Sequence, residues 1–246
     1  MSETVNPIKN KTDYILLTRD LLQRTKDAKT NLRNYFMFRV GMCCVLRISD
    51  IVSMRVHDLY DADLNVKPRL TIKEIKTGKK KDMSTAHFKK DAEKYRDEVL
   101  KPRLNKTYPD KATKCLSSDE TIEIGTGKNK REINKYATDW LFTSNRYPFK
   151  HVDEKAFYKA IKASAKDVNL EHIGTHTMRK TGAYLLYRGN FDDVLKDKNV
   201  KPNNNISLAM KVLNHSSQAS TLRYLGLDKE TLDKAINDID AFDIEI

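Results

Sequence analysis

The sequence predicts an α+β fold that is mainly helical and carries one small antiparallel β-hairpin. Apolar side chains recur at three- and four-residue spacing in several segments, which is the period of a helix with one buried face. The stretch from Leu70 to Thr85 instead alternates on both sides of Thr77-Gly78, which is typical of two strands joined by a tight turn. The 246 residues are enough to bury a sizeable core.

The charge of the chain indicates a polyanionic partner. Lys and Arg number 46 against 34 Asp and Glu, a net charge of +12. Nucleic acid is the first candidate for such a partner, and ribosomal, membrane-surface or merely soluble basic proteins share this composition. Seven acids against two bases leave residues 225–246 at −5, so residues 1–224 hold +17. We therefore expect a basic body that contacts phosphate and an acidic tail, 225–246, that contacts protein.

The cysteines argue against a metal framework. Cys43 and Cys44 are adjacent in an apolar run and Cys115 is isolated, so the chain has no CxxC pair and we expect no zinc framework. Free thiols are typical of a reducing cytoplasm. The polar N-terminus shows no signal peptide, and the absence of an 18-residue apolar run predicts a protein that does not span a membrane.

The first half of the chain begins with a polar stretch, 1–12, that we expect to be a flexible arm before a domain covering 13–224. A helix is predicted from Asp13, and a second, 31–45, is apolar almost all round and therefore central. Arg47 follows it directly, and Ser49 is a candidate cap for the next helix. Asp50 lies three residues after Arg47, which leaves two interpretations: a carboxylate that orients Arg47, or an ordinary surface ion pair.

The predicted hairpin, 64–85, is dense in lysine. The five lysines are Lys73, Lys76, Lys79, Lys80 and Lys81. One interpretation is a basic turn exposed to solvent. The other is a hairpin tip that inserts at DNA phosphates, with one lysine donating a proton.

The middle of the chain is the least regular part. We predict a helix over 86–101 ended by Pro102, irregular structure over 103–131, a short helix over 130–139 and a longer one over 152–168. Gly125-Thr-Gly127 lacks the spacing of a phosphate-binding loop. Four other histidines show no metal-ligand spacing: His57, His87, His151 and His172.

The last third of the chain carries four chemically active side chains in two motifs. A helix capped by Thr175 carries His176 and Arg179 on one face, because residues three apart are neighbours on a helix. A polar loop, 190–205, and a helix, 206–213, follow. Asn214 ends that helix, His215 comes next, and Ser216 or Ser217 caps a helix that reaches Tyr224.

These motifs, taken in order, resemble those of the tyrosine recombinases, the phage-type integrases. The resemblance rests on Arg47 in Leu-Arg-Ile-Ser-Asp, Lys76-Thr-Gly in the hairpin, His176-x-x-Arg179, and Leu-Asn-His215 with Tyr224 nine residues later, and it covers roughly 30–225. A lone HxxR is a weak signal, but the ordered set is specific. The resemblance implies the catalytic-domain fold of that family and a site-specific recombinase or integrase of a mobile element.

The chemistry implied by the resemblance agrees with what the residue types can do. Two guanidiniums, Arg47 and Arg179, match the charge that spreads over phosphate oxygens in the transition state. His176 and His215 supply further donors, and His176 is a candidate base. Tyr224 is the implied nucleophile, forming a 3′-phosphotyrosine. Its reaction needs neither metal nor ATP, since the covalent bond conserves the energy of the broken one.

The general acid of the implied reaction is a hairpin lysine. Lys76 stands where the family has its lysine, with Lys73 and Lys79 as alternatives. The remaining hairpin lysines are expected to bind DNA together with these: Lys80 and Lys81.

Two departures from the family bear on assembly. Arg47 comes so early that about 30 residues cannot supply the usual DNA-clamping domain, which implies an excised catalytic domain or a naturally short enzyme. Asn214 replaces a glycine that the family commonly has. The resemblance implies that the protein forms a tetramer on DNA and can be a monomer in free solution. In such a tetramer the amphipathic tail would dock on a neighbouring subunit. The alternative is a tail helix that folds back onto its own domain.

Three rival functions remain open at this stage, the last of them a generic basic scaffold protein in which the ordered set of motifs is a coincidence. A type IB topoisomerase uses similar chemistry to relax supercoils. A DNA-binding protein with lapsed catalysis would bind DNA in a salt-dependent way without becoming covalently attached.

Overall fold

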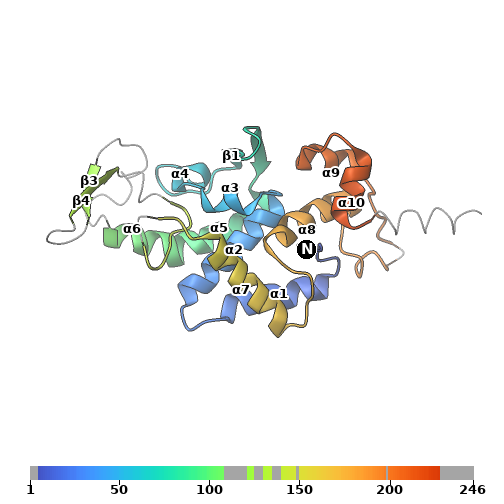
Figure 1. Ribbon diagram of the computed structural model, residues 1–246, viewed down its shortest axis with the longest axis horizontal. Coiled ribbons are helices and arrows are strands. Elements are labelled where there is room, and N and C mark those ends of the chain that lie inside the picture. The colour runs from blue at the N-terminus through green and yellow to red at the C-terminus, as the bar shows by residue number, and fades with distance from the viewer. Residues whose placement is uncertain are drawn as a thin grey trace, which may run out of the picture.

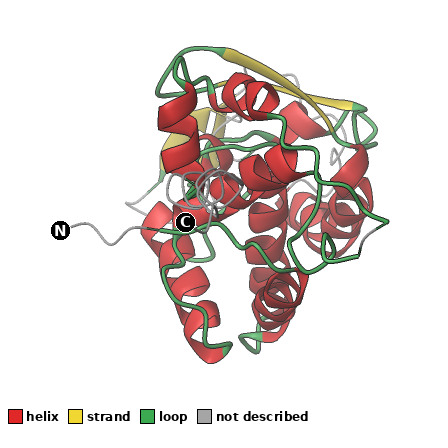
Figure 2. Cartoon of the chain, turned by 90° about the vertical axis from the view of Figure 1, so that its right-hand side faces the viewer, coloured by secondary structure: helices red, strands yellow, loops and turns green. Residues whose placement is uncertain are grey.

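The structure, a computed structural model, describes residues 5–107, 121–124, 130–134, 140–147, 150–197 and 199–227. Helices dominate it, and strands form two separate antiparallel pairs, β1–β2 and β3–β4 (Figure 2). The predicted mainly helical α+β fold is therefore confirmed. The β1–β2 hairpin stands at the top of the molecule in Figure 1, and α9 and α10 lie to its right above α8.

The elements follow one another with short connections through most of the described chain. The helices are α1 (Lys11–Gln23), α2 (Ala28–Cys43), α3 (Ile48–Val52), α4 (Val56–Leu59), α5 (Lys89–Tyr95), α6 (Lys101–Thr107), α7 (Glu154–Asp167), α8 (Thr175–Arg188), α9 (Ile206–Leu213) and α10 (Gln218–Leu225). The strands are β1 (Arg69–Lys73), β2 (Lys80–Ser84), β3 (Thr121–Ile124) and β4 (Arg131–Asn134), and two short helical turns are η1 (Ala86–Phe88) and η2 (Arg96–Leu100).

Helix α2 is the centre of the main hydrophobic core. Asp27 caps its N-terminus by accepting from the Lys29 backbone N–H, and apolar residues cover most of its surface. Phe36 from this helix packs against Tyr95 and Phe142, with ring centroids 5.0 and 5.7 Å away. Helices α1, α5 and α8 pack around α2, as its nearly all-round apolar sequence predicts.

Helices α2 and α8 cross at close range, with a glycine on each helix at the crossing. A Cβ at Gly182 would lie 2.0 Å from the Met42 carbonyl oxygen, and one at Gly41 would lie 2.4 Å from Met178 Sδ. Only glycine lets the two backbones come this near. The close approach brings the start of α8 against the loop that follows α2.

A second, smaller cluster of buried residues holds α9 and α10 against α8. Its buried members are Val45, Ala183, Tyr184, Ala209, Leu213, Leu225 and Leu227. Asn205 and Ser217 cap the two short helices by accepting from backbone N–H groups, and Asn214 ends α9 in the left-handed conformation, with φ of 60°. The predicted ends of both helices are thereby confirmed.

Three predicted segments were wrong in detail. The described part of the expected arm, 5–12, is packed: Ile8 is buried and its backbone N–H donates to Thr181 Oγ1 at 2.9 Å. Pro102 does not end a helix; α6 continues directly from the π-type turn η2, in which the Lys101 N–H bonds five residues back to the Arg96 carbonyl, and Pro102 lies where this wider turn passes into α6.

The predicted helix over 130–139 was also wrong where the structure describes it. Residues 131–134 form β4, which pairs with β3. The paired strand partner satisfies the backbone and outweighs a weak helical pattern. Thr175 begins α8 as its first residue, not as its cap; Thr177 Oγ1 instead accepts from the Gly174 N–H at 3.0 Å.

Some predictions fall outside the described residues: Cys115, the Gly125-Thr-Gly127 stretch and the tail from 228 onward. Within the described ranges, no helix is long and apolar enough to cross a membrane. Nor do His, Cys, Asp and Glu gather there in a group that could hold a metal ion.

Candidate active site

The two arginines predicted from distant motifs come together beside the α2–α8 crossing. Arg47 lies in the extended turn between α2 and α3, and Arg179 lies on the first turns of α8. Arg179 is buried: its Nη1 donates to the Val45 carbonyl at 2.9 Å and its Nη2 to the Leu213 carbonyl at 3.3 Å. The guanidinium thus connects the end of α2 with the end of α9. Arg47 keeps 20% of its side chain exposed.

A buried carboxylate, Glu74, lies between the two arginines. Its Oε1 is 3.1 Å from Arg47 Nη1, 3.5 Å from Arg179 Nη1 and 3.4 Å from Lys81 Nζ. We refer to these four residues as the arginine centre. None of the Glu74 side chain is exposed. Sequence reasoning missed this residue.

The charges of the arginine centre shift the pKa values of its members. Burial works to raise the pKa of Glu74, but a hydrogen bond from Thr77 and the charges of Lys81, Arg47 and Arg179 outweigh it and lower that pKa to about 2. Burial and the nearby Arg179 charge lower the pKa of Lys81 to about 8. Glu74 is therefore ionised at neutral pH and the centre remains cationic.

His215 and Tyr224 occupy the tyrosine segment, defined as α9, α10 and the turn between them. The His215 ring meets the Tyr224 ring edge to face, with centroids 5.3 Å apart and an interplanar angle of 88°. His215 Nδ1 is 3.1 Å from Thr221 Oγ1, whose own hydroxyl donates to the Ser217 carbonyl at 2.9 Å. Since the threonine proton is used there, Nδ1–H is the donor to Thr221, which leaves Nε2 of His215 for other partners.

The hydroxyl group of Tyr224 lies near positively charged side chains. Burial raises its pKa, while Arg179 and Arg47 act in the opposite direction by favouring the phenolate. The Lys180 ammonium lies over the ring, 4.9 Å from its centroid. The buried hydroxyl makes no hydrogen bond of regular geometry within the described residues, but it lies close enough to the Arg179 guanidinium for a hydrogen-bonding interaction that lowers its pKa.

His176 lies on the exposed side of α8, one turn before Arg179. Partial burial and the charges of Arg179, Lys180, Arg47 and Lys76 lower its pKa. Its imidazole is therefore mostly neutral at neutral pH. The same is true of His215, whose pKa burial, Arg179 and Arg47 all lower. The structure thus brings Arg47, Arg179, His176, His215 and Tyr224 close enough together for the two arginines to shift the pKa values of the other three.

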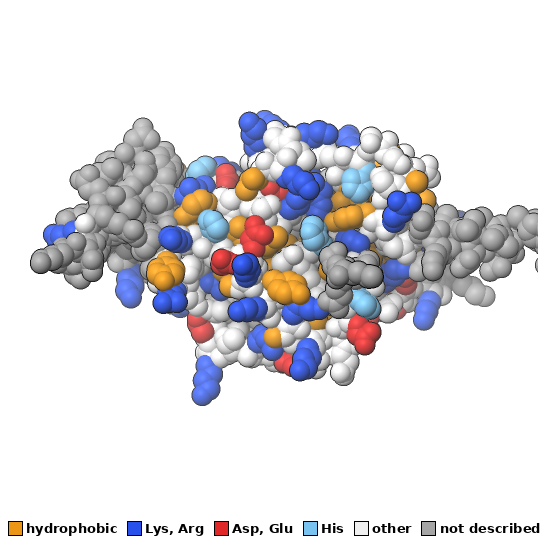
Figure 3. Space-filling view, viewed as in Figure 1, with side chains coloured by type: hydrophobic (Ala, Val, Ile, Leu, Met, Phe, Trp, Pro, Cys, Tyr) orange, Lys and Arg blue, Asp and Glu red, His pale blue; other side chains and the backbone are white. Residues whose placement is uncertain are grey.

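The hairpin lysines divide into two groups. Lys73, Lys76, Lys79 and Lys80 are exposed at its tip, where basic side chains gather at the top of the surface in Figure 3. Lys81 is the exception, because it is only 8% exposed and its Nζ donates to the Val45 carbonyl at 2.9 Å. The expectation that Lys81 offers itself to DNA with the other lysines was wrong.

Asp50 supports the hairpin and not Arg47. One of its oxygens, Oδ1, accepts from the Ile75 backbone N–H at 2.9 Å, while the described ion pair of Arg47 goes to Glu74. Asp50 is buried, so the alternative of an ordinary surface pair is wrong as well.

A period of two along the hairpin could have predicted both the missed residue Glu74 and the burial of Lys81. Leu70 and Ile72 face inward on β1, and the next inward position is Glu74. On β2, inward-facing Met83 predicts the same for Lys81, two residues earlier. No comparable signal marks Thr221 or Lys180, whose contacts depend on how α8 and α10 pack.

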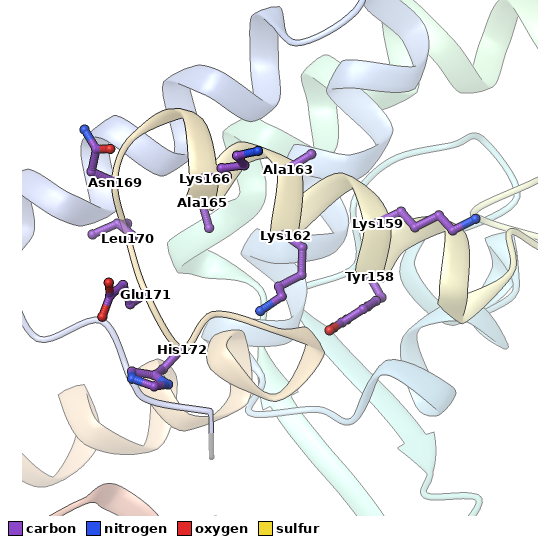
Figure 4. Close-up of a pocket in the computed structure, with 10 residues that line it drawn as sticks. All are labelled: Tyr158, Lys159, Lys162, Ala163, Ala165, Lys166, Asn169, Leu170, Glu171 and His172. Carbon is purple, nitrogen blue, oxygen red and sulfur yellow. The ribbon is translucent and has the colours of Figure 1, made fainter. Parts of the chain in front are cut away.

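A large surface cavity lies elsewhere and contains none of the predicted site residues. It measures about 880 Å³ and is formed by α7 and the turn that follows it, with Tyr158, Lys162 and His172 among the lining residues (Figure 4). Arg47 is the most solvent-exposed residue of the arginine centre, and no residue of that centre lines this cavity.

A comparison with known protein families identifies the family of this chain. Residues 18–231 match the phage integrase family over most of the chain. The chain belongs to the phage integrase family. A curated relative, the "Probable integrase/recombinase YoeC" of Bacillus subtilis (strain 168), is 29% identical over 207 residues, covering 82% of this chain and 81% of that protein.

Solved structures of this family share the fold. The XerH site-specific recombinase, crystallised in a post-cleavage complex with a palindromic difH substrate, superposes with a TM-score of 0.58 at 17% identity over 97% of this chain. XerA recombinase gives a TM-score of 0.56 at 17% identity over 95% of this chain. The chain spans about half the length of the XerH chain, 54%, and 65% of XerA. At these identities the likeness concerns the fold alone.

Proposed function

We propose that this protein cleaves and rejoins DNA strands through a covalent 3′-phosphotyrosine at Tyr224, as a site-specific recombinase. The observation that carries the proposal is the convergence of Arg47, Arg179, His215 and Tyr224 at one partly open site, where the Tyr224 hydroxyl interacts with the Arg179 guanidinium. Residues 13–224 are its catalytic domain in this proposal.

The first step is attack by the Tyr224 phenolic oxygen on a phosphodiester phosphorus. The P–O5′ bond breaks, the phosphate stays on the tyrosine as a 3′-phosphotyrosine, and the 5′-oxygen leaves with a proton. Arg47 and Arg179 stabilise the negative charge that grows on the nonbridging oxygens. Attack by a 5′-hydroxyl of a partner strand reverses the step and restores the free tyrosine.

Two proton transfers accompany the step. The phenol must lose its proton, and neutral His176 and the Nε2 atom of His215 are candidate acceptors. The leaving oxygen must gain one, and exposed Lys76 at the hairpin tip is the candidate donor, with Lys73 and Lys79 as alternatives. The reaction as proposed uses no metal and no cofactor, because the phosphotyrosine bond conserves the energy of the cleaved bond.

The partner in this proposal is double-stranded DNA, on which the protein assembles as a tetramer. Its net charge of +12 favours such a partner. The relatives include a XerH complex with its difH substrate and a lambda integrase tetramer bound to a Holliday junction. The tail, 225–246, is the proposed contact between subunits.

Covalent trapping tests the proposal. Wild-type protein is incubated with fragments of its source genome, including the flanks of its own gene, then denatured, and protein-linked DNA is mapped by mass spectrometry. We expect DNA attached through a 3′-phosphate to Tyr224. Tyr224→Phe should form no adduct, while Tyr158→Phe, a matched change at an exposed tyrosine, should behave as wild type.

The products distinguish the proposal from its rivals. Joining of strands between two captured duplexes supports a recombinase, whereas relaxation of supercoils without joining supports a topoisomerase. Salt-dependent binding with no adduct at any DNA would contradict the proposal and indicate a binding protein.

A further inference from the structure

The buried carboxylate of Glu74 contacts more of the site than any residue predicted from sequence. Its Oε1 meets Arg47, Arg179 and Lys81 at 3.1 to 3.5 Å. Its Oε2 accepts from Thr77 Oγ1 at 2.6 Å and from Asn214 Nδ2 at 3.3 Å. One side chain thus joins the α2–α3 turn, α8, the hairpin and the tyrosine segment.

We infer that Glu74 is a positioning residue for the proposed strand cleavage: its carboxylate holds Arg47 and Arg179 in the orientation that receives the phosphate and fixes that pair relative to the turn that leads to Tyr224. The inference rests on the proposed function. Glu74 is not a catalytic residue, because its buried oxygens are all directed at protein groups.

Backbone hydrogen bonds hold Glu74 in place, so its side chain is not a mobile group that fills the proposed phosphate site and leaves when DNA binds. Its backbone N–H donates to the Lys79 carbonyl at 2.9 Å and its carbonyl accepts from the Gly78 N–H at 2.8 Å, which anchors it at the base of the hairpin turn. Arg47 Nη1 is 3.1 Å from the carboxylate as an ion pair without regular hydrogen-bond geometry, and 20% of the Arg47 side chain stays exposed, so its guanidinium can still reach a phosphate oxygen.

Electrostatics explains why the arginines need this carboxylate. Without it, Arg47, Arg179 and Lys81 would place three cations around one buried point, and repulsion among them is strong where water is excluded. With Glu74 ionised the centre keeps a net charge of +2. That charge suits a phosphodiester that gains a second negative charge when a phenolate attacks it.

The link to Asn214 extends this positioning to the nucleophile. Asn214 is the left-handed residue directly before His215, and its amide donates to Glu74 Oε2. The carboxylate therefore sets where the arginines lie and where the turn between α9 and α10 begins. Thr77 connects the same atom with the hairpin tip, next to Lys76.

Glu74→Gln tests the inference, because it keeps the shape and removes the charge. Cleavage of a duplex captured by wild-type protein is measured under single-turnover conditions at saturating DNA, and binding is measured on that duplex and on a random-sequence duplex of the same length. We expect adduct formation to slow by about 10- to 100-fold. Binding should stay equal or become tighter, because the site gains positive charge. Glu93→Gln, the same change at an exposed ion pair with Lys89, should alter neither quantity.

The split between rate and binding separates positioning from a general loss of structure, which would weaken both. A double variant, Glu74→Gln with Lys81→Met, returns the net charge of the centre to +2. We expect it to remain slow, because the arginines still lack their anchor. Recovery of the wild-type rate in the double variant would overturn the positioning role, and so would a wild-type rate in Glu74→Gln alone.

A second variant covers the case in which Glu74→Gln does not fold. Asn214→Gly keeps the left-handed backbone and deletes only the amide that contacts Glu74. We expect a three- to tenfold slower adduct formation with unchanged binding, and an unchanged rate would contradict the inference. Absence of any wild-type adduct would overturn the proposed function itself, and the inference with it.

Discussion

The arginine centre and the tyrosine segment differ in how firmly the fold holds them. Arg179 and Glu74 are buried beside the α2–α8 crossing, where two glycines bring the backbones into contact next to the main core. The tyrosine segment consists of two helices of eight residues each, packed on a small separate cluster. In the proposed reaction, the charge-stabilising groups are thus preset, while the nucleophile sits on the part that is easier to move.

The largest expected effect tests the rigidity of the crossing. Gly182→Ala would place a Cβ 2.0 Å from the Met42 carbonyl, so the helices must separate, and we expect a loss of about 3 kcal/mol or more in the free energy of unfolding. Denaturant unfolding measures it. Gly226→Ala is the control: it sits at a φ of +70° with open space around its Cβ, and should cost only about 1 kcal/mol. Equal losses at the two positions would refute a tight crossing.

The next prediction tests whether the two regions unfold separately. Leu213→Ala in the small cluster and Leu17→Ala in the main core remove equally buried side chains, each at a cost of about 2–5 kcal/mol. We expect Leu213→Ala to speed hydrogen exchange in α9 and α10 alone and to slow adduct formation, and Leu17→Ala to speed exchange throughout α1 and α2. Identical exchange maps for the two variants would show that the molecule unfolds as one unit.

The smallest expected effect concerns the orientation of His215 inside the tyrosine segment. Thr221→Val keeps the shape of a buried side chain and removes the oxygen that accepts from Nδ1. We expect adduct formation to fall by about tenfold, the rate equivalent of one hydrogen bond. NMR of the imidazole nitrogens should show a mixture of tautomers in place of one. A single unchanged tautomer in the variant would mean that Thr221 does not set it.

Much of the site was predictable because its chemistry is carried by local patterns. The His176–Arg179 spacing needs only a helix, the Thr77-Gly78 turn needs only two strands, and Asn214 and Ser217 mark where two helices end and begin. Each of these follows from the geometry of a few consecutive residues. The family resemblance then supplied the order in which such patterns form one site.

The sequence by itself determined the helical α+β fold, the basic charge and the local motifs from which the candidate site is proposed. Tertiary structure alone decided their partners. Asp50 supports the Ile75 N–H instead of Arg47, and Lys81 turns inward while its neighbours stay at the surface. Glu74 becomes the common partner of three cations. These outcomes depend on contacts between residues far apart in the chain, where burial removes water and makes the pairing of each charge obligatory.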